Sequence, residues 1–585
     1  MKMKSNIIPF LLACAFLIQP ALAEAPATPA PPTTPPAVVH SPIMPVKIKP
    51  RQSGADSISK AAADIEQENT INANSLGLFT RISDGGLGGD VWKNYTGKAL
   101  ASDLGMLNVN ISSPAMRALL LRALLTSPDA ETLPEDKESE AFSARITTLV
   151  DLGAFDETVV LYKKLEGNIP SGKAALAGTE AMVSMGQMGI SCLEEKALPD
   201  DMKGTSSTSF WPDLEQFCNI LLTTDATDDE SESFAKTASL FTSAKQLTAP
   251  ATLSELNGKS VIGVLAMNKS GLIPKNLFTP ENIKPLKPQI ISLLLKQSPI
   301  DPQQRLSLLS VAVEKGMVPS TDFTNEFITQ TASSSTSAPS YWSPFMTLYN
   351  KLQSSPADAD KSVVLKEVLK IAVASSNAAL LPFGASFGSL KNVDTFTTEE
   401  ARKVVSLLVR AKINVSGAWY AKAFGRPDAQ NRESVTDLDV ISALKASLKS
   451  NSHGKAETND NKEVESKKSK EMLENPKLYA LSLILKTQEA EDKIKEKSYE
   501  NLFSLTGSND YVMPSKELMN NLAQVAAKQD TGKVIIYSLQ ILNGQRISQI
   551  HPLALIRISE GLQSVGLSEE NRSLAHEVLA DLIEY

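Results

Sequence analysis

Apolar residues recur along most of this chain with the spacing of one α-helix face. In segments 116–125, 144–152 and 157–165 they stand at i, i+3, i+4 and i+7, positions that share a helix face. The apolar run at 534–537 resembles a strand, but its pattern continues to a length typical of a helix. The pattern therefore predicts an all-α protein.

Two distant segments share the same pattern of residues that end one helix and begin the next. Residues 149–161 and 562–574 both contain a helix end, a glycine, an acidic first turn and a second apolar stripe. The glycines, Gly153 and Gly566, occupy a position where a helix commonly ends in a left-handed residue. Both segments therefore predict two helices joined by a short turn.

A second pair of similar segments has the spacing of a helical repeat. Segment 271–278 (GLIPKNLF) recurs 45 residues later as segment 316–323 (GMVPSTDF), and that period is typical of repeats of two or three helices. Each such unit buries its apolar face against the next unit. We therefore expect an α-solenoid of stacked helical hairpins.

The beginning of the chain has the features of an export signal. Two lysines precede an apolar run over 7–18, and a small-x-small motif ends at Ala23. We expect a signal peptide over residues 1–23, cleaved between Ala23 and Glu24, and a soluble protein in the periplasm or outside the cell.

An alternative interpretation places a lipobox at Leu11-Leu12-Ala13-Cys14. Lipidation of Cys14 would then anchor the protein to a membrane. The apolar run continues beyond Cys14, which favours cleavage after Ala23.

Changes in composition divide the chain into segments. Residues 451–471 have almost no apolar side chain and cannot offset their ordering entropy by burial. We expect, in order, the signal peptide, a Pro-rich disordered linker (24–58), an α-helical repeat domain (59–450), a charged disordered insert (451–471) and a C-terminal helical block (472–585) that continues the solenoid.

The charge of the chain excludes one class of partner. The formal net charge is −8, and it becomes −10 when the two lysines of the signal leave, because residues 1–23 contain no acidic side chain. An acidic chain without a concentrated basic face argues against nucleic-acid binding. Outside the signal no apolar run approaches the about 20 residues of a membrane span, so we expect none after cleavage.

Two of the three cysteines are outside the predicted signal peptide. Cys192 and Cys218 are 26 residues apart, and an exported protein enters an oxidising compartment. We therefore predict a disulfide between them. The alternative is a pair of buried thiols that behave as small apolar side chains.

Residues 384–388 match the G-x-S-x-G motif of serine hydrolases, with Ser386 as the nucleophile. That chemistry needs a strand before the serine, a helix after it, and an acid and a histidine downstream. A proline precedes the motif, and the downstream histidines stand in polar or helical surroundings: His453, His551 and His576. A small-residue loop between helices explains the segment more simply.

Three further motifs are incomplete. Residues 85–90 fit a calcium-binding β-roll unit, but such units bind calcium in tandem and only one copy is present. Residues 257–260 resemble the end of a phosphate-binding loop whose first glycine is replaced by Leu253. His576 lacks the second histidine of a zinc motif, since position 580 is alanine. We expect no cofactor and no metal site.

Aromatic side chains form small clusters beside predicted helix starts. Such rings can stack on sugars, but they more commonly close a helical hairpin. The residues concerned are Trp211, Phe217, Trp342, Phe345, Tyr349, Trp419 and Tyr420.

Four short blocks resemble a family of exported helical-repeat proteins of Gram-negative bacteria: 85–97, 113–125, 211–218 and 556–562. The likeness extends over most of residues 76–585. Membership would imply a tetratricopeptide-like solenoid, and it implies no activity.

The absence of a complete catalytic motif favours a non-enzymatic function. We expect a periplasmic scaffold or adaptor that binds another envelope protein or peptide segment in a solenoid groove. One alternative is an envelope hydrolase that uses Ser386 on peptidoglycan or an ester. A glycan-binding module is the other.

Overall fold

The computed structural model describes residues 72–442 and 511–584, with gaps at 135, 137, 205–208, 225–229, 297–299, 334–340, 356, 373–376, 427–428, 437–438 and 441. Within these ranges the regular elements are helices, and β-structure is limited to two isolated bridges. The all-α prediction is therefore confirmed. The predicted signal peptide with Cys14, Ala23 and Glu24, the linker, His453 and the insert 451–471 lie outside the described residues.

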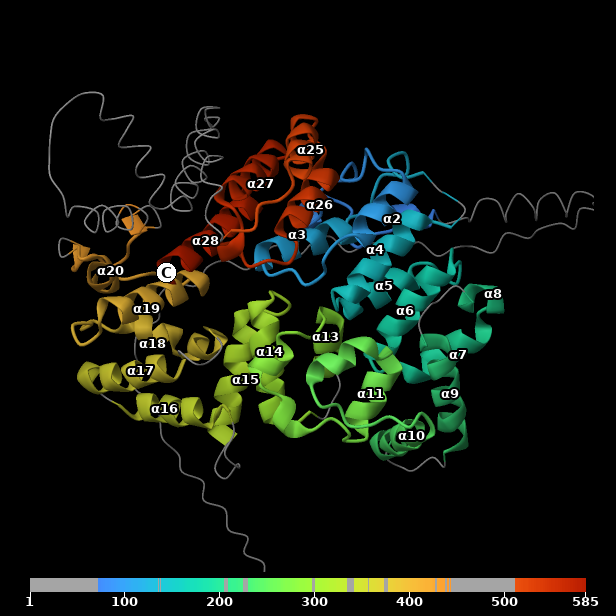
Figure 1. Ribbon diagram of the computed structural model, residues 1–585, viewed down its shortest axis with the longest axis horizontal. Coiled ribbons are helices and arrows are strands. Elements are labelled where there is room, and N and C mark those ends of the chain that lie inside the picture. Colours follow the sequence, from blue (N-terminus) through green and yellow to red (C-terminus); the bar gives the residue numbers. More distant parts are fainter. Residues whose placement is uncertain are drawn as a thin grey trace, which may run out of the picture. The chain divides into compact units, whose positions relative to one another are not determined.

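From α2 to α20 and from α25 to α28 the described helices follow one another along the chain (Figure 1). The α-helices are α2 (Gly97–Gly105), α3 (Pro114–Leu125), α4 (Glu140–Asp151), α5 (Phe155–Lys163), α6 (Gly172–Ser184), α7 (Met188–Ala197), α8 (Asp200–Lys203), α9 (Phe210–Thr223), α10 (Glu230–Ala244), α11 (Val261–Lys269), α12 (Pro280–Ile283), α13 (Pro288–Lys296), α14 (Pro302–Glu314), α15 (Ser320–Ser333), α16 (Ser343–Ser354), α17 (Asp358–Ala372), α18 (Gly384–Ser389), α19 (Thr398–Arg410), α20 (Gly417–Phe424), α25 (Lys516–Ala527), α26 (Thr531–Leu542), α27 (Pro552–Ser564) and α28 (Ser568–Glu584). The 3₁₀ helices are η1 (Ala73–Ser75), η2 (Ile82–Asp84), η3 (Leu253–Gly258), η4 (Lys275–Leu277), η5 (Asn377–Phe383) and η7 (Ile547–Gln549). None of the described helices is both long and apolar enough to cross a bilayer.

The predicted turn between two helices is present in both segments. Gly153 lies between α4 and α5 with φ of 74°, and Gly566 lies between α27 and α28 with φ of 79°. Both values fall in the left-handed region that glycine adopts without the strain of a side chain. The rival strand at 534–537 lies inside α26.

The segments that begin at Gly271 and Gly316 have the same structure at their start and then differ. Gly271 and Gly316 both follow a helix and both have positive φ, and Phe278 and Phe323 are both buried. After Gly316 the chain forms the long helix α15, whereas after Gly271 it forms η4 and the short α12. The two copies therefore share a helix end and a buried aromatic anchor, and they differ in the helices that come next.

Successive helices pack as neighbours and then fold back. Helix α4 contacts α5 and α6, α6 contacts α7, and α7 contacts α9. Further along the chain, α11 packs against α6 and α13 packs against α4. Ser292 of α13 donates a 2.7 Å hydrogen bond to the carbonyl of Gly153. One side of the α4–α6 pair is therefore covered by the chain itself.

The last helix joins two distant parts of the chain. Helix α28 packs against α19 and against α3. Arg410 of α19 pairs with Asp581 at 2.7 Å, and Arg122 of α3 pairs with Glu570. The C-terminal helices therefore depend on both the N-terminal helices and α19 for their packing.

Helix α3 contacts a charged side chain from another helix at each end. At its C-terminal end the fully buried Arg145 of α4 donates to the carbonyls of Leu124 (2.9 and 2.6 Å) and Thr126 (2.9 Å). At its N-terminal end Glu577 of α28 accepts from the backbone N–H of Ala115 at 2.7 Å. A cation at the carbonyl end and a carboxyl acceptor at the N–H end both satisfy backbone groups that a helix leaves unpaired at its ends.

Candidate interaction surface

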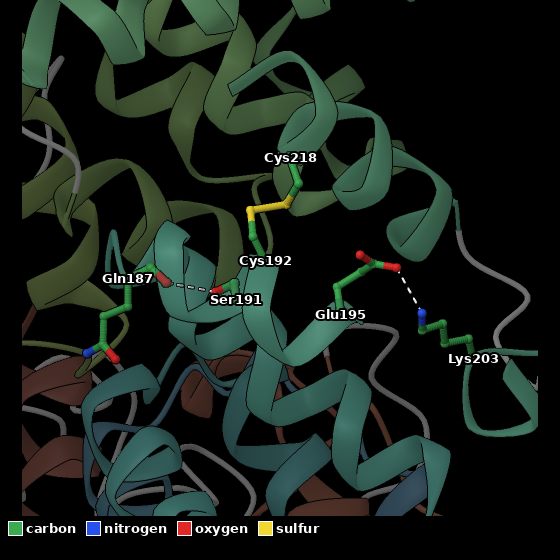
Figure 2. Close-up of a disulfide and its surroundings, with 6 residues drawn as sticks. All are labelled: Gln187, Ser191, Cys192, Glu195, Lys203 and Cys218. Carbon is green, nitrogen blue, oxygen red and sulfur yellow. Dashed lines mark hydrogen bonds and ion pairs between the residues drawn. A yellow bond between two sulfur atoms is a disulfide. The ribbon is translucent and has the colours of Figure 1, made fainter. Parts of the chain in front are cut away.

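A disulfide joins helices α7 and α9 (Figure 2). Cys192 and Cys218 have a Cα–Cα distance of 5.7 Å, within the range that a disulfide spans. On the same helix as Cys192, Glu195 pairs with Lys203 at 2.8 Å, which ties the start of the α7–α9 connection to α7. The structure thus pairs the two cysteines as the sequence predicted.

Removing this disulfide should lower the free energy of unfolding by about 3.5 kcal/mol, because a closed loop of this length restricts the unfolded chain. The measurement is urea denaturation of the oxidised and the reduced protein. Cys192→Ala/Cys218→Ala is the control, since its midpoint should not respond to reductant. Equal midpoints for the oxidised and reduced wild-type protein would contradict the prediction.

Side-chain hydrogen bonds connect α7 to α5 on its other side. The Tyr162 hydroxyl donates to Glu194 Oε1 at 2.6 Å, and Lys163 Nζ donates to Gln187 Oε1 at 3.3 Å. Burial raises the pKa of the Tyr162 hydroxyl, and the bond to Glu194 raises it further, so this hydroxyl remains a donor at neutral pH. Helices α5, α7 and α9 therefore form a cross-linked set.

Four large aliphatic side chains on these three helices are exposed to solvent. The exposed fractions are 52% for Val160, 49% for Ile190, 70% for Leu193 and 67% for Leu222. We call these four residues the outer apolar stripe. Scattered exposed aliphatic side chains are ordinary, whereas a contiguous exposed apolar patch is typical of an interaction site.

The helix positions of Ile190, Leu193 and Leu222 relate these side chains to the contacts that join the three helices. Ile190 is three residues from Gln187 and four from Glu194, so it shares the α7 face that contacts α5. Leu193 is three residues further along α7, beside the disulfide. Leu222 is one turn beyond Cys218, on the side of α9 that faces α7.

A shallow hollow of about 370 Å³ runs along α9 beside the stripe. It is lined by polar side chains together with one proline and one isoleucine: Pro212, Glu215, Gln216, Asn219, Ile220 and Thr223. Glu215 is two turns from Leu222 on the same side of α9. The hollow therefore offers acceptors next to apolar contact area.

The acidic charge of the chain is concentrated in the segment that contains this surface. Residues 155–232 contain 15 acidic and five basic side chains. Their net charge of −10 exceeds in magnitude the −8 of the whole chain. Asp200, Asp201 and Glu215 are exposed, so part of this charge reaches solvent near the stripe.

Ser386 lies in a setting different from that of a hydrolase nucleophile. It is inside the short helix α18 and follows the 3₁₀ helix η5, whereas the G-x-S-x-G elbow requires a strand before the serine. His551 is engaged elsewhere, since its Nδ1 accepts from the backbone N–H of Leu553 at the start of α27. His576 lies on α28.

The other incomplete motifs have packing roles. Arg122 donates from Nε to the carbonyl of Gly85 at 2.9 Å, which fixes the glycine-rich turn against α3. Asn257 donates to the carbonyl of Pro285 at 3.0 Å, and Ser260 caps α11. In the described residues no three His, Cys, Asp or Glu side chains gather as metal ligands would.

The aromatic clusters lie inside the protein. Six of the seven rings are buried, and Tyr349 is half-buried. Trp342 contacts Phe323 at a ring-centroid distance of 5.5 Å, and Trp419 contacts Phe396 at 4.9 Å. Rings packed in this way hold helices together and leave little face for a sugar.

The outer apolar stripe was not predicted from the sequence. Ile190 and Leu193 stand next to core positions such as Met188 and Ser191, so the periodic pattern merges the two sets. A signal was present in the second apolar face of this helix, at 190, 193 and 197, where a surface helix normally carries polar residues.

Comparison of the chain with protein-family models, with curated proteins and with solved structures gave no match.

Proposed function

We propose that this chain is a non-enzymatic scaffold or adaptor of the bacterial envelope that binds a segment of another protein. The outer apolar stripe is the observation that carries the proposal, because exposed aliphatic groups on linked helices are typical of protein interaction sites. The consecutive contacts of α4 to α9 support a solenoid of stacked helical pairs related to exported tetratricopeptide-like proteins.

The compartment is part of the same proposal. The Cys192–Cys218 disulfide supports an oxidising environment such as the periplasm. We infer export by a signal peptide cleaved between Ala23 and Glu24, which mass spectrometry of the protein from the cell envelope would test. Finding diacylglycerol on Cys14 would show instead that the protein is a membrane-anchored lipoprotein.

The scaffold proposal uses an outer surface in place of the groove that the sequence suggested. Helices α11 and α13 pack against α6 and α4, and Gln289 of α13 donates to Glu180 of α6 at 3.4 Å. That side of the pair is therefore occupied by the chain itself. The exposed aliphatics of α5, α7 and α9 remain available to a partner.

A photo-crosslinking amino acid at position 193 should capture one partner protein in whole cells. The same probe at Val363 on α17, which is 62% exposed, is the matched control and should not capture that protein. Leu222→Asp, added to the chain with the probe at 193, should weaken the crosslink because it places a charge in the apolar contact. Identical products from positions 193 and 363, or none from 193, would overturn the proposal.

A further inference from the structure

We propose that the outer apolar stripe docks a cationic amphipathic helix of the partner polypeptide. This inference rests on the proposed scaffold function and specifies the chemistry of its partner. Two observations support it. The aliphatic side chains of the stripe are exposed on three helices that are linked to one another. The segment that carries them has an acidic formal charge.

The dimensions of the stripe match one face of a helix. Neighbouring helices pack about 8–10 Å apart, so crossing from α5 to α9 through α7 covers about 20 Å. A helix rises 1.5 Å per residue, and about 14 residues therefore span this distance. A ligand helix with apolar residues at i, i+3 or i+4 and i+7 would present a continuous stripe of that length.

The charge selects a basic partner. Residues 155–232 have a formal net charge of −10. Part of it is neutralised, because burial raises the pKa of Glu180 to about 8 and Asp213 pairs with Lys245. The carboxylates of Asp200, Asp201 and Glu215 are exposed. Opposite charge on the ligand increases the association rate and disfavours acidic competitors. An anionic lipid surface would be repelled by the same groups, which favours a polypeptide over a membrane.

The hollow along α9 adds a place for a basic side chain. Glu215, Gln216 and Asn219 line it, and their side-chain oxygens accept hydrogen bonds. A lysine or arginine that flanks the apolar face of the ligand helix can place its stem over Ile220 and its charged end at Glu215.

The test uses a display library of helical 16-residue peptides with an amphipathic pattern and random charged positions, selected on the mature oxidised protein. We expect enrichment of Leu, Ile or Phe on one face and of Lys or Arg beside it. The enriched peptides should lose affinity as salt increases. Leu193→Asp and Leu222→Asp should each weaken them about tenfold or more, and Val363→Asp should leave their affinity unchanged.

The outcomes separate this inference from the function on which it rests. Enrichment of acidic or uncharged peptides, equal binding by the Leu193→Asp variant, or binding to phosphatidylglycerol vesicles in place of peptides would overturn the cationic helix. If the library enriches no cationic amphipathic peptide but the probe at position 193 still captures a protein in cells, the inference is wrong. The scaffold function stands in that case. If neither experiment gives a partner, both are wrong. Circular dichroism of each variant excludes loss of fold as the cause.

Discussion

Replacing Arg145 by methionine is expected to lower the free energy of unfolding by about 3–5 kcal/mol. Its guanidinium donates to the carbonyls of Leu124, Thr126 and Asn74, and Arg145 is completely buried. Methionine leaves these carbonyls without their donor in a site that water does not reach. Burial lowers the pKa of Arg145 to about 9, so the side chain is still a cation at neutral pH.

Urea denaturation followed by circular dichroism measures this loss. Arg572→Met on α28 is the matched control, because Arg572 is 58% exposed and its ion pair with Glu569 is 3.5 Å long. Exposed pairs of this kind contribute less than about 1 kcal/mol. A similar stability change in the two variants would show that the bonds of Arg145 do not stabilise α3.

Local sequence signals were sufficient for the helical fold class and for two of the hairpin turns. The residues around Gly153 and Gly566 combine an apolar helix end, a glycine and an acidic first turn, and each signal acts within a few residues. The cysteine pair could also be predicted, because Cys192 and Cys218 were the two cysteines left after the predicted signal. Short stretches of sequence therefore predict the turns at Gly153 and Gly566.

The contacts between distant helices could not be predicted in this way. Arg145 lies in the apolar pattern of α4, where a charged residue usually marks the solvent face, yet its partners are up to 71 residues away. Glu577 follows the histidine of an incomplete zinc motif, and its partner Ser113 is 464 residues away. Periodicity reports which face of a helix is buried and does not report which helix covers it.

The same limit applies to the outer apolar stripe. Leu222 follows Leu221 in the sequence, and only the structure shows that Leu221 packs against the core while Leu222 is exposed. An aliphatic residue on a second face of a helix either packs against another part of the chain or is exposed to solvent. Tertiary packing distinguishes these two cases, and here it leaves the side chains of the stripe on α5, α7 and α9 exposed.

Replacing Glu577 by alanine is expected to cost about 2 kcal/mol of stability. Glu577 accepts hydrogen bonds from Ser113 Oγ at 2.6 Å and from the backbone N–H of Ala115 at 2.7 Å. Alanine leaves both donors unpaired at the first turn of α3 and removes a contact between α28 and α3. Thermal unfolding at fixed pH measures the loss, and Glu569→Ala on the same helix, with a side chain 81% exposed, is the control.

The pH dependence of Glu577→Gln should reveal the protonation state of this group. Burial raises the pKa of Glu577 from 4.5 to about 7 in the folded protein, although the hydrogen bonds from Ser113 and Ala115 act to lower it. The folded state therefore binds this proton more tightly than the unfolded state does. The contribution of Glu577 to stability is fully present below pH 4.5 and is lost as pH rises to about 7.

Glutamine is neutral throughout this range, so the wild-type protein should lose melting temperature relative to Glu577→Gln as pH increases. Asp151, Glu180 and Glu560 also have pKa values raised by burial, but they titrate in both proteins and cancel in the difference. A wild-type advantage that grew with pH would mean that the carboxylate is favoured in the folded state, contrary to the effect of its burial. A difference that does not change with pH would place the titration of Glu577 outside this window. A difference that falls between pH 4.5 and about 7 would show that burial disfavours the Glu577 carboxylate in the folded protein, even though the hydrogen bonds from Ser113 and Ala115 favour that form.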